Sequence, residues 1–220
     1  MSNLNQLILS FEYEQNFKNL DFYVSKSNAH VFNLIKNWSS QKEKFLNIIG
    51  EKFCGKSHLI SIFLEKNEGL RIDSDKLNNR FFKKIKFYKN IILEDLTLKI
   101  NEKLFYSLIN IVEAENKHLI VTSDVSIVNL NFKLSDLKSR SKNFTLTSIE
   151  NPDDDLIFAL VLKNLSDRQI SINKKLIDYI IKRIDRSYSN ISDFVYKIDQ
   201  LSLKKKRSID FRIIKEALGD

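Results

Sequence analysis

The sequence contains few residues that break regular structure and few that bind metals. Four glycines and one proline among 220 residues argue against a disordered chain and against a β-sandwich, which needs many turns. The only cysteine, Cys54, cannot form a disulfide within the chain, and three scattered histidines form no metal-binding pattern. No apolar run approaches the roughly 20 residues that span a membrane, and no export signal is visible. We therefore expect a cytoplasmic protein without a membrane partner.

The positive charge of the chain does not by itself indicate a DNA-binding protein. The formal net charge is +8, but Lys, Asn, Ile and Phe are abundant together, as a strongly AT-biased coding sequence would produce. The basic residues are spread along the chain, apart from the run Lys204–Arg207 between two helical patterns. Such a run is more typical of a solvated connection than of a DNA contact. We expect any contact with DNA to be indirect.

One segment has the complete pattern of a phosphate-binding loop. We call it the phosphate loop, and it reads Gly50-Glu51-Lys52-Phe53-Cys54-Gly55-Lys56-Ser57. It follows an apolar run that predicts a buried strand and leads into an apolar stretch that suits a helix, which is the context this pattern requires. The glycines let backbone N–H groups surround phosphates, Lys56 reaches the outer phosphates, and the Ser57 hydroxyl can bind Mg²⁺. The alternative is an ordinary glycine-rich turn, but the context favours nucleotide binding.

The apolar pattern divides the chain into three parts. Residues 1–14 are predicted to form a short tail. From 15 to 150, strand-like and helix-like segments alternate, which predicts a parallel sheet covered by helices. From 151 to 220, after the only proline, the sequence is helical throughout, and we call this part the lid. The expected fold class is α/β, with an αβα phosphate-loop core and a small all-helical lid, as in AAA+ ATPases.

Individual elements follow from the same pattern. The expected strands are 45–49, 69–72, 90–95, 118–123 and 144–149. The expected helices include 27–38, 102–116, 153–166, 173–185, 189–203 and 208–218.

Four further residues, at three places in the chain, could act on a bound nucleotide. Glu94 and Asp95 end the third strand, where one carboxylate can hold Mg²⁺ through water and the other can polarise an attacking water. Aspartate is usual at the first position, so Glu94 is expected to weaken hydrolysis. Ser123 ends the fourth strand and could sense the γ-phosphate. Arg140 precedes the last strand and could stabilise charge on phosphates bound by a neighbouring subunit. Alternatives without a catalytic role stay open. Glu94 and Asp95 could simply be an acidic strand end, Ser123 a polar strand end, and Arg140 a surface arginine.

Several segments resemble the replication initiator DnaA and its AAA+ family. In order, they are Gly55-Lys56-Ser57-His58-Leu59, Val121-Thr122-Ser123-Asp124, Leu137-Lys138-Ser139-Arg140 and Asn151-Pro152-Asp153. The stretch 21–28 resembles the segment that lines the adenine site in that family. The resemblance implies that Phe22, Val24 and Asn28 contact the base, and that the phosphate loop together with His58 contacts the rest of the nucleotide.

The N-terminal tail carries a second resemblance. Gln6-Leu7-Ile8-Leu9-Ser10-Phe11 resembles the short peptide by which replication proteins dock on the sliding clamp of the DNA polymerase. An extended tail can place Leu7, Leu9 and Phe11 in apolar pockets, while the Gln6 amide makes directed hydrogen bonds. The alternative is an amphipathic first strand.

A core and lid, without the initiator's DNA-binding domain, resemble the regulatory branch of the DnaA family, the bacterial inactivators of initiation. The resemblance implies that the clamp recruits the protein and that Arg140 acts in trans on ATP held by DnaA. Bound ADP or ATP with Mg²⁺ would set the protein's shape, and a homodimer is a further possible assembly.

The lid departs from the family at one position. Ser192 stands where the family commonly has an arginine that contacts the nucleotide, and Arg186 could substitute for it. With Glu94 in addition, we expect weak intrinsic ATPase activity. The alternatives are a helicase-loader-like or DNA-remodelling ATPase, and a nucleotide-gated scaffold.

Overall fold

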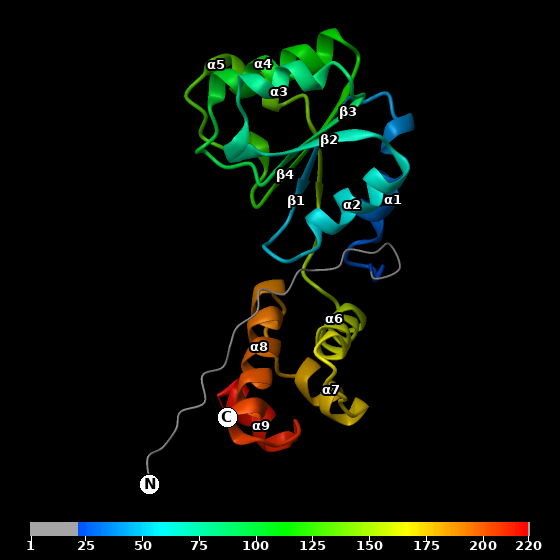
Figure 1. Cartoon of the computed structure of the whole chain (residues 1–220), viewed down its shortest axis with the longest axis vertical. Helices are drawn as coiled ribbons and strands as arrows, with labels where there is room; N and C mark the ends of the chain where they lie inside the picture. Colours follow the sequence, from blue (N-terminus) through cyan, green and yellow to red (C-terminus); the bar gives the residue numbers. More distant parts are fainter. Residues whose placement is uncertain (1–21, 220) are drawn as a thin grey trace.

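The computed structural model describes residues 22–219, and its centre is a five-stranded parallel sheet (Figure 1). The strands are β1 (Phe45–Ile49), β2 (Gly69–Asp73), β3 (Asn90–Glu94), β4 (His118–Ser123) and β5 (Thr145–Ser148), in the order β2-β3-β4-β1-β5. Every residue of β3 and β4 is buried, which is why the central residues of both strands, Ile91–Leu93 and Leu119–Val121, are all apolar and do not alternate with polar ones. The predicted α/β fold class is confirmed.

Helices cover both faces of the sheet. They are α1 (Ala29–Lys36), α2 (Lys56–Lys66), α3 (Asn79–Ile85), α4 (Glu102–Ala114) and α5 (Ser135–Ser141). Figure 1 shows α3, α4 and α5 on one face and α1 and α2 on the other. Ile91 and Leu93 of β3 pack in one apolar cluster with Phe105 of α4, whereas Ile92 packs in a second cluster with Leu59 of α2. The two-residue period of the strand thus builds two separate core layers.

Four helices follow the sheet and pack around a core of their own. They are α6 (Asp154–Asp167), α7 (Lys174–Ile181), α8 (Tyr188–Lys205) and α9 (Phe211–Leu218). Each begins after a residue whose side chain accepts a hydrogen bond from a backbone N–H of the first turn: Asp153, Asn173, Ser187 and Asp210. The cap at Asp210 explains why α9 starts three residues after the predicted 208.

The division of the chain at residue 150 stays an interpretation. The sheet ends at Ser148 and only helices follow among the described residues up to 219. However, Leu156 of α6 and Tyr188 of α8 pack in the same apolar cluster as α1 and α2. The C-terminal helices therefore have a private core and also contact the layer that carries the phosphate loop.

The sequence did not predict α3 as a helix. It has seven residues, of which only Ile85 is buried, so no helical period of apolar residues is visible. Its start depends instead on Asn78, whose side chain accepts a hydrogen bond from the Arg80 N–H at 2.9 Å. A short helix fixed by its cap is difficult to recognise from apolar spacing.

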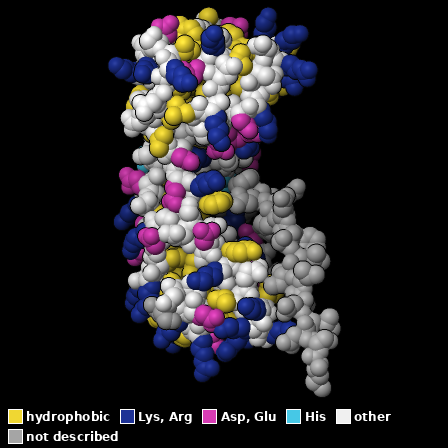
Figure 2. Space-filling model, turned by 90° about the vertical axis from the view of Figure 1, so that its left-hand side faces the viewer, with side chains coloured by type: hydrophobic (Ala, Val, Ile, Leu, Met, Phe, Trp, Pro, Cys, Tyr) yellow, Lys and Arg dark blue, Asp and Glu magenta, His cyan; other side chains and the backbone are white. Residues whose placement is uncertain are grey.

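The surface carries its positive charge in a scattered form. On the face that Figure 2 shows, Lys and Arg side chains lie both over the sheet-containing part and over the C-terminal helices, interspersed with Asp and Glu. Within residues 22–219, no helix has the length and apolar character needed to cross a bilayer.

Candidate functional site

The phosphate loop joins the end of β1 to the start of α2 through an unusual backbone. Gly55 has φ +98° and lies immediately before the first residue of α2. A Cβ on Gly50 would lie 2.5 Å from Cys54 Sγ, so a side chain there would displace the thiol. Phe53 has φ +66°, a region that a bulky residue rarely adopts, and its side chain is exposed. The loop therefore needs both glycines and holds Phe53 in a strained conformation.

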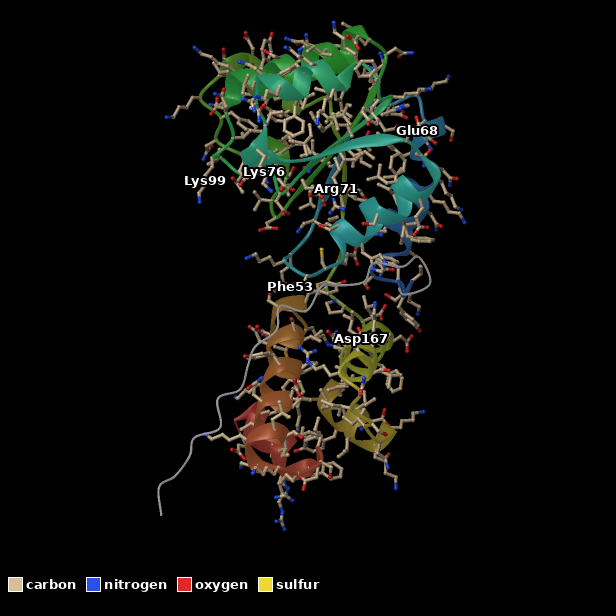
Figure 3. The ribbon with its side chains drawn as sticks, viewed as in Figure 1. Phe53, Glu68, Arg71, Lys76, Lys99 and Asp167 are labelled. Carbon is tan, nitrogen blue, oxygen red and sulfur yellow. The ribbon has the colours of Figure 1, made fainter. Side chains whose placement is uncertain are left out.

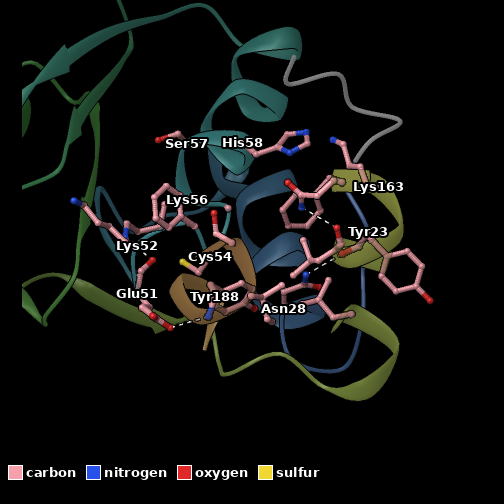
Figure 4. A pocket seen from close by; sticks show the side chains of 18 of the residues that line it. Tyr23, Asn28, Glu51, Lys52, Cys54, Lys56, Ser57, His58, Lys163 and Tyr188 are labelled. Carbon is pink, nitrogen blue, oxygen red and sulfur yellow. Dashed lines mark hydrogen bonds between the residues drawn. The ribbon is translucent and has the colours of Figure 1, made fainter. Parts of the chain in front are cut away.

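A cavity of about 880 Å³ opens between this loop and the C-terminal helices (Figure 4). This volume is within the range of small-molecule and cofactor sites. The walls include Phe22, Tyr23, Asn28, Glu51 to His58, Asp95, Asp124, Lys163, Asn164, Asp167, Arg168, Tyr188, Ile191 and Ser192. Phe53, Cys54, Gly55, Lys56, Ser57 and His58 are thus brought together, as the sequence suggested.

Lys56 is held against the wall of the cavity by three oxygens. Its ammonium group donates to the carbonyl of Gly50, to the carbonyl of Glu51 at 3.1 Å and to Asp124 Oδ1 at 2.9 Å. The side chain is only 7% exposed, whereas that of Asp124 is 61% exposed. An anionic phosphate entering the cavity would compete with Asp124 for this buried cation.

Aromatic rings form the end of the cavity where the base is expected. The Phe22 ring is stacked on Phe32 at 5.6 Å between centroids and meets the His58 ring edge-on at 5.2 Å. The same ring covers Gly55, since a Cβ there would lie 3.2 Å from Phe22 Cε2. A flat apolar surface of this kind suits a nucleobase.

Asn28 organises the segment that carries Phe22. Its side chain donates to the Tyr23 carbonyl at 2.9 Å and accepts from the Ser25 N–H at 2.9 Å. Figure 4 shows Asn28 and Tyr23 at the wall of the cavity. Val24, between these two contacts, is 41% exposed and does not line the cavity, so the structure does not support a base contact for it.

Glu51 connects the phosphate loop to α8. Its carboxylate accepts the N–H of Tyr188 at 3.1 Å and the N–H of Ser189 at 3.2 Å, at the first turn of that helix. Burial alone would raise the pKa of Glu51, but hydrogen bonds from Ser189, Tyr188 and Ser187 outweigh it and lower the pKa. A carboxylate at a helix N-terminus also interacts favourably with the helix dipole. No local sequence pattern indicates this contact between distant segments.

Two basic residues of the lid reach the cavity, one in α6 and one directly after it, although no lid cation was expected there. Lys163 and Arg168 both line it. Arg168 is oriented by Asp199 of α8 at 3.1 Å. Ser192 also lines the cavity, at the position where the family has an arginine, whereas Arg186 pairs with Asp154 at 2.7 Å and does not line it. Knowing which face of α6 meets the core would have identified Lys163 and Arg168.

Ser123 is placed differently from the expectation. It is 1% exposed, and its hydroxyl lies 2.8 Å from the Asn47 amide of the neighbouring strand β1. The next residue, Asp124, faces the cavity and pairs with Lys56. The polar side chain at this strand end that faces the cavity is therefore one residue further along the chain.

The two acids that end β3 have different surroundings. Asp95 is exposed, lines the cavity and has φ +52°, with its carbonyl accepting from the Ser74 hydroxyl at 2.7 Å. Glu94 is 2% exposed, does not line the cavity and forms an ion pair with Arg71 of β2. The Mg²⁺ role predicted for Glu94 does not fit this arrangement, because the carboxylate is already bound to a guanidinium. Ser57, at the cavity, stays a predicted ligand.

Arg140 lies in α5, on the face of the sheet opposite α2. Its guanidinium pairs with Glu113 of α4, and its side chain is 33% exposed. It does not line the cavity of its own chain. Residues Gln6, Leu7, Leu9 and Phe11 of the predicted clamp peptide lie outside the described residues.

The fold is similar to that of the AAA+ domain of DnaA. Domain III of Thermotoga maritima DnaA superposes with a TM-score of 0.74 at 15% identity, over 96% of this chain and 98% of that domain. AMPPCP-bound DnaA from Aquifex aeolicus gives a TM-score of 0.66 at 19% identity, over 83% and 65% of the two chains.

Sequence comparison leads to the same initiator. DnaA of Caldanaerobacter subterraneus is 23% identical over 80% of this chain and 45% of its own length. The chain thus spans about half the length of such DnaA relatives. An uncharacterized protein of Haemophilus influenzae is 23% identical over 90% of this chain and 92% of its own length. No protein-family model matches the sequence.

Proposed function

We propose that this chain is a regulatory nucleotide-binding protein that acts on DnaA, in the manner of the DnaA-homologous inactivator Hda. Recruited by the sliding clamp, it would present Arg140 to ATP held by DnaA and stimulate the hydrolysis of that ATP. The product, ADP-bound DnaA, would no longer start replication. DNA would be reached only through the clamp, and a homodimer is an additional assembly that this proposal allows.

The position of Arg140 is the observation that carries this proposal. The residue is oriented by Glu113, is one-third exposed and lies away from the cavity of its own chain. A guanidinium fixed in this way is suited to phosphates on another molecule, where it can stabilise charge in the transition state. Within an AAA+ fold like that of DnaA, ATP bound by DnaA is the fitting target.

The nucleotide in the chain's own cavity would act as a structural ligand. Phe22 and Asn28 would hold the base, and the phosphate loop with Lys56 would hold the phosphates of ADP or ATP. Asp95 would polarise the attacking water, but Glu94 is occupied by Arg71, so we expect weak intrinsic turnover. Because Glu51 joins the phosphate loop to α8, nucleotide binding would set the orientation of the C-terminal helices.

The decisive experiment follows conversion of ATP–DnaA to ADP–DnaA in the presence of clamp-loaded DNA. We expect Arg140→Ala to lower the rate of conversion about 10³-fold, as for other arginines that act in trans. Lys138→Ala removes the same charge from the same helix and should convert at the parent rate. Replacing Gln6 and Leu7 by alanine should abolish stimulation by the clamp while leaving ADP binding intact.

Two outcomes would contradict the proposal. Equal conversion by Arg140→Ala and the parent protein would exclude the trans-acting arginine. Robust ATP turnover by the isolated chain would favour the alternative, a helicase-loader-like or DNA-remodelling ATPase.

A further inference from the structure

The carboxylate of Glu94 is bound to an arginine of the neighbouring strand. Glu94 is the last residue of β3, and Asp73 of β2 lies opposite it in the parallel register. Arg71, two residues before Asp73, is therefore on the same face of the strand. Its Nε donates to Glu94 Oε2. Sequence inspection finds the glutamate but not its partner, because the pairing depends on how β2 and β3 align.

The same guanidinium reaches toward the helix that begins at the phosphate loop. Arg71 Nη1 lies 3.5 Å from Ser61 Oγ, and the Ser61 hydroxyl donates to the Ser57 carbonyl at 2.9 Å. Figure 3 shows Arg71 between β2 and α2. A permanent positive charge thus stands between Glu94 and the first turns of α2, where Ser57 is located.

Glu94 needs this counter-charge because it is removed from water. Its side chain is 3% exposed, and Oε1 has no hydrogen-bond partner among residues 22–219. A buried carboxylate is strongly disfavoured unless a cation compensates it. Arg71, itself 40% exposed, provides that compensation from the edge strand of the sheet. Among residues 22–219, no group of three His, Cys, Asp or Glu side chains could hold a metal ion.

We propose that Arg71 removes Glu94 from metal binding, so that the cavity binds ADP or ATP with an affinity that does not depend on Mg²⁺. A divalent cation placed between Ser57 and Glu94 would meet a fixed guanidinium and a carboxylate that is already neutralised. The inference rests on nucleotide binding by this chain and does not require any action on DnaA.

The test is the affinity of the full chain for ADP, measured by calorimetry with Mg²⁺ and with EDTA. The parent protein should bind with dissociation constants that agree within about twofold. Arg71→Gln keeps a polar side chain but frees Glu94, and Mg²⁺ should then tighten ADP binding by about tenfold. Glu94→Gln added to Arg71→Gln should abolish this response to the metal.

A matched control comes from the same strand edge. Lys76 pairs with Asp73 at the surface and does not contact Glu94, so Lys76→Gln removes one positive charge without freeing the carboxylate. This variant should respond to Mg²⁺ like the parent. Thermal unfolding of each variant without nucleotide verifies that it is folded.

The arms with an intact Arg71 decide the matter even if Arg71→Gln fails to fold. Tightening of ADP binding by more than about twofold with Mg²⁺ in the parent would overturn the inference. So would a metal response that Glu94→Gln alone changes, or an Arg71→Gln variant that ignores Mg²⁺. Absence of ADP binding under both conditions would overturn the proposed nucleotide role as well, whereas binding that requires Mg²⁺ overturns this inference alone.

Discussion

The backbone of Gly55 is the most demanding single position of the phosphate loop. Replacing it by alanine introduces a Cβ at φ +98° and 3.2 Å from the Phe22 ring. We expect Gly55→Ala to lower the free energy of unfolding by about 1–2 kcal/mol from the backbone alone. Because the Phe22 ring must move, ADP binding should be lost as well. Urea denaturation and calorimetry measure the two effects.

Gly219 provides the control for this substitution. It also has a left-handed backbone, with φ +89°, but a Cβ there would have no neighbour within 4 Å. Gly219→Ala should therefore lower the free energy of unfolding only through its strained backbone, and it should bind ADP like the parent. Equal ADP affinity in both variants would show that the Phe22 contact does not shape the cavity.

Single residues were predictable from sequence only where one segment determines their position. Lys56 and Ser57 follow from the glycine spacing of their own loop. Arg71 did not, since its role depends on the alignment of two strands. Asp124, and not the expected Ser123, faces the cavity, because Asn47 of the neighbouring strand β1 binds the Ser123 hydroxyl. The positions of Arg71 and Asp124 depend on contacts between distant segments, and such contacts cannot be read from a local sequence pattern.

At the scale of elements, the contact between Glu51 and α8 is open to a direct test. Glu51→Gln removes a carboxylate that accepts two N–H groups of α8, and we expect the unfolding free energy at neutral pH to fall by about 1 kcal/mol. Hydrogen bonding lowers the pKa of the folded carboxylate below its ordinary 4.5, so its contribution is present above that pH. It is lost as the pH falls through the lowered value. The difference between parent and variant should disappear in acid.

Glu102 provides a control that separates the contribution of Glu51 to stability from its contribution at the cavity. Its carboxylate accepts the N–H groups of Lys133 at 2.9 Å and Leu134 at 2.8 Å, away from the cavity wall. Glu102→Gln should lower stability in the same pH-dependent way but leave ADP affinity unchanged. Glu51→Gln should weaken ADP binding. If both variants bind ADP equally, Glu51 has no part in coupling.

Elements differed in how far the sequence specified them. The strands 45–49 and 118–123 have the predicted bounds, because a strand buried on both faces of a parallel sheet contains a run of apolar residues that can be recognised in the sequence. Helix α3 was missed, because its cap and not an apolar stripe starts it. The existence of an element follows from burial, whereas short capped elements depend on single side chains.

At the scale of the whole molecule, the cavity belongs to neither part alone. The phosphate loop and Phe22 supply one wall. The lid supplies the other, through Lys163 of α6, Arg168 directly after α6, and Ser192 of α8. The sequence predicted both parts but not how they face each other. Tyr188 is central to that arrangement, since it packs in the core layer of α2 and its hydroxyl donates to the Glu150 carbonyl at 3.0 Å.

The burial of Cys54 in the same apolar cluster as Tyr188 makes the reaction of its thiol a measure of local opening. The thiol is 4% exposed, and burial raises its pKa to about 11, so at pH 8 the closed molecule has almost no reactive thiolate. Alkylation therefore requires an opening that exposes the thiol. We expect separation of α8 from the phosphate loop to be that opening, so the labelling rate at this sole cysteine would report how readily it occurs.

Saturating ADP should slow the labelling by about 100-fold if its concentration is 100 times the dissociation constant. Mass spectrometry of the intact chain follows the reaction. A labelling rate indifferent to ADP would mean that the loop exposes its thiol without α8 moving away. The half-life of an iodoacetamide reaction thus becomes a measure of how long the two parts of the molecule stay together.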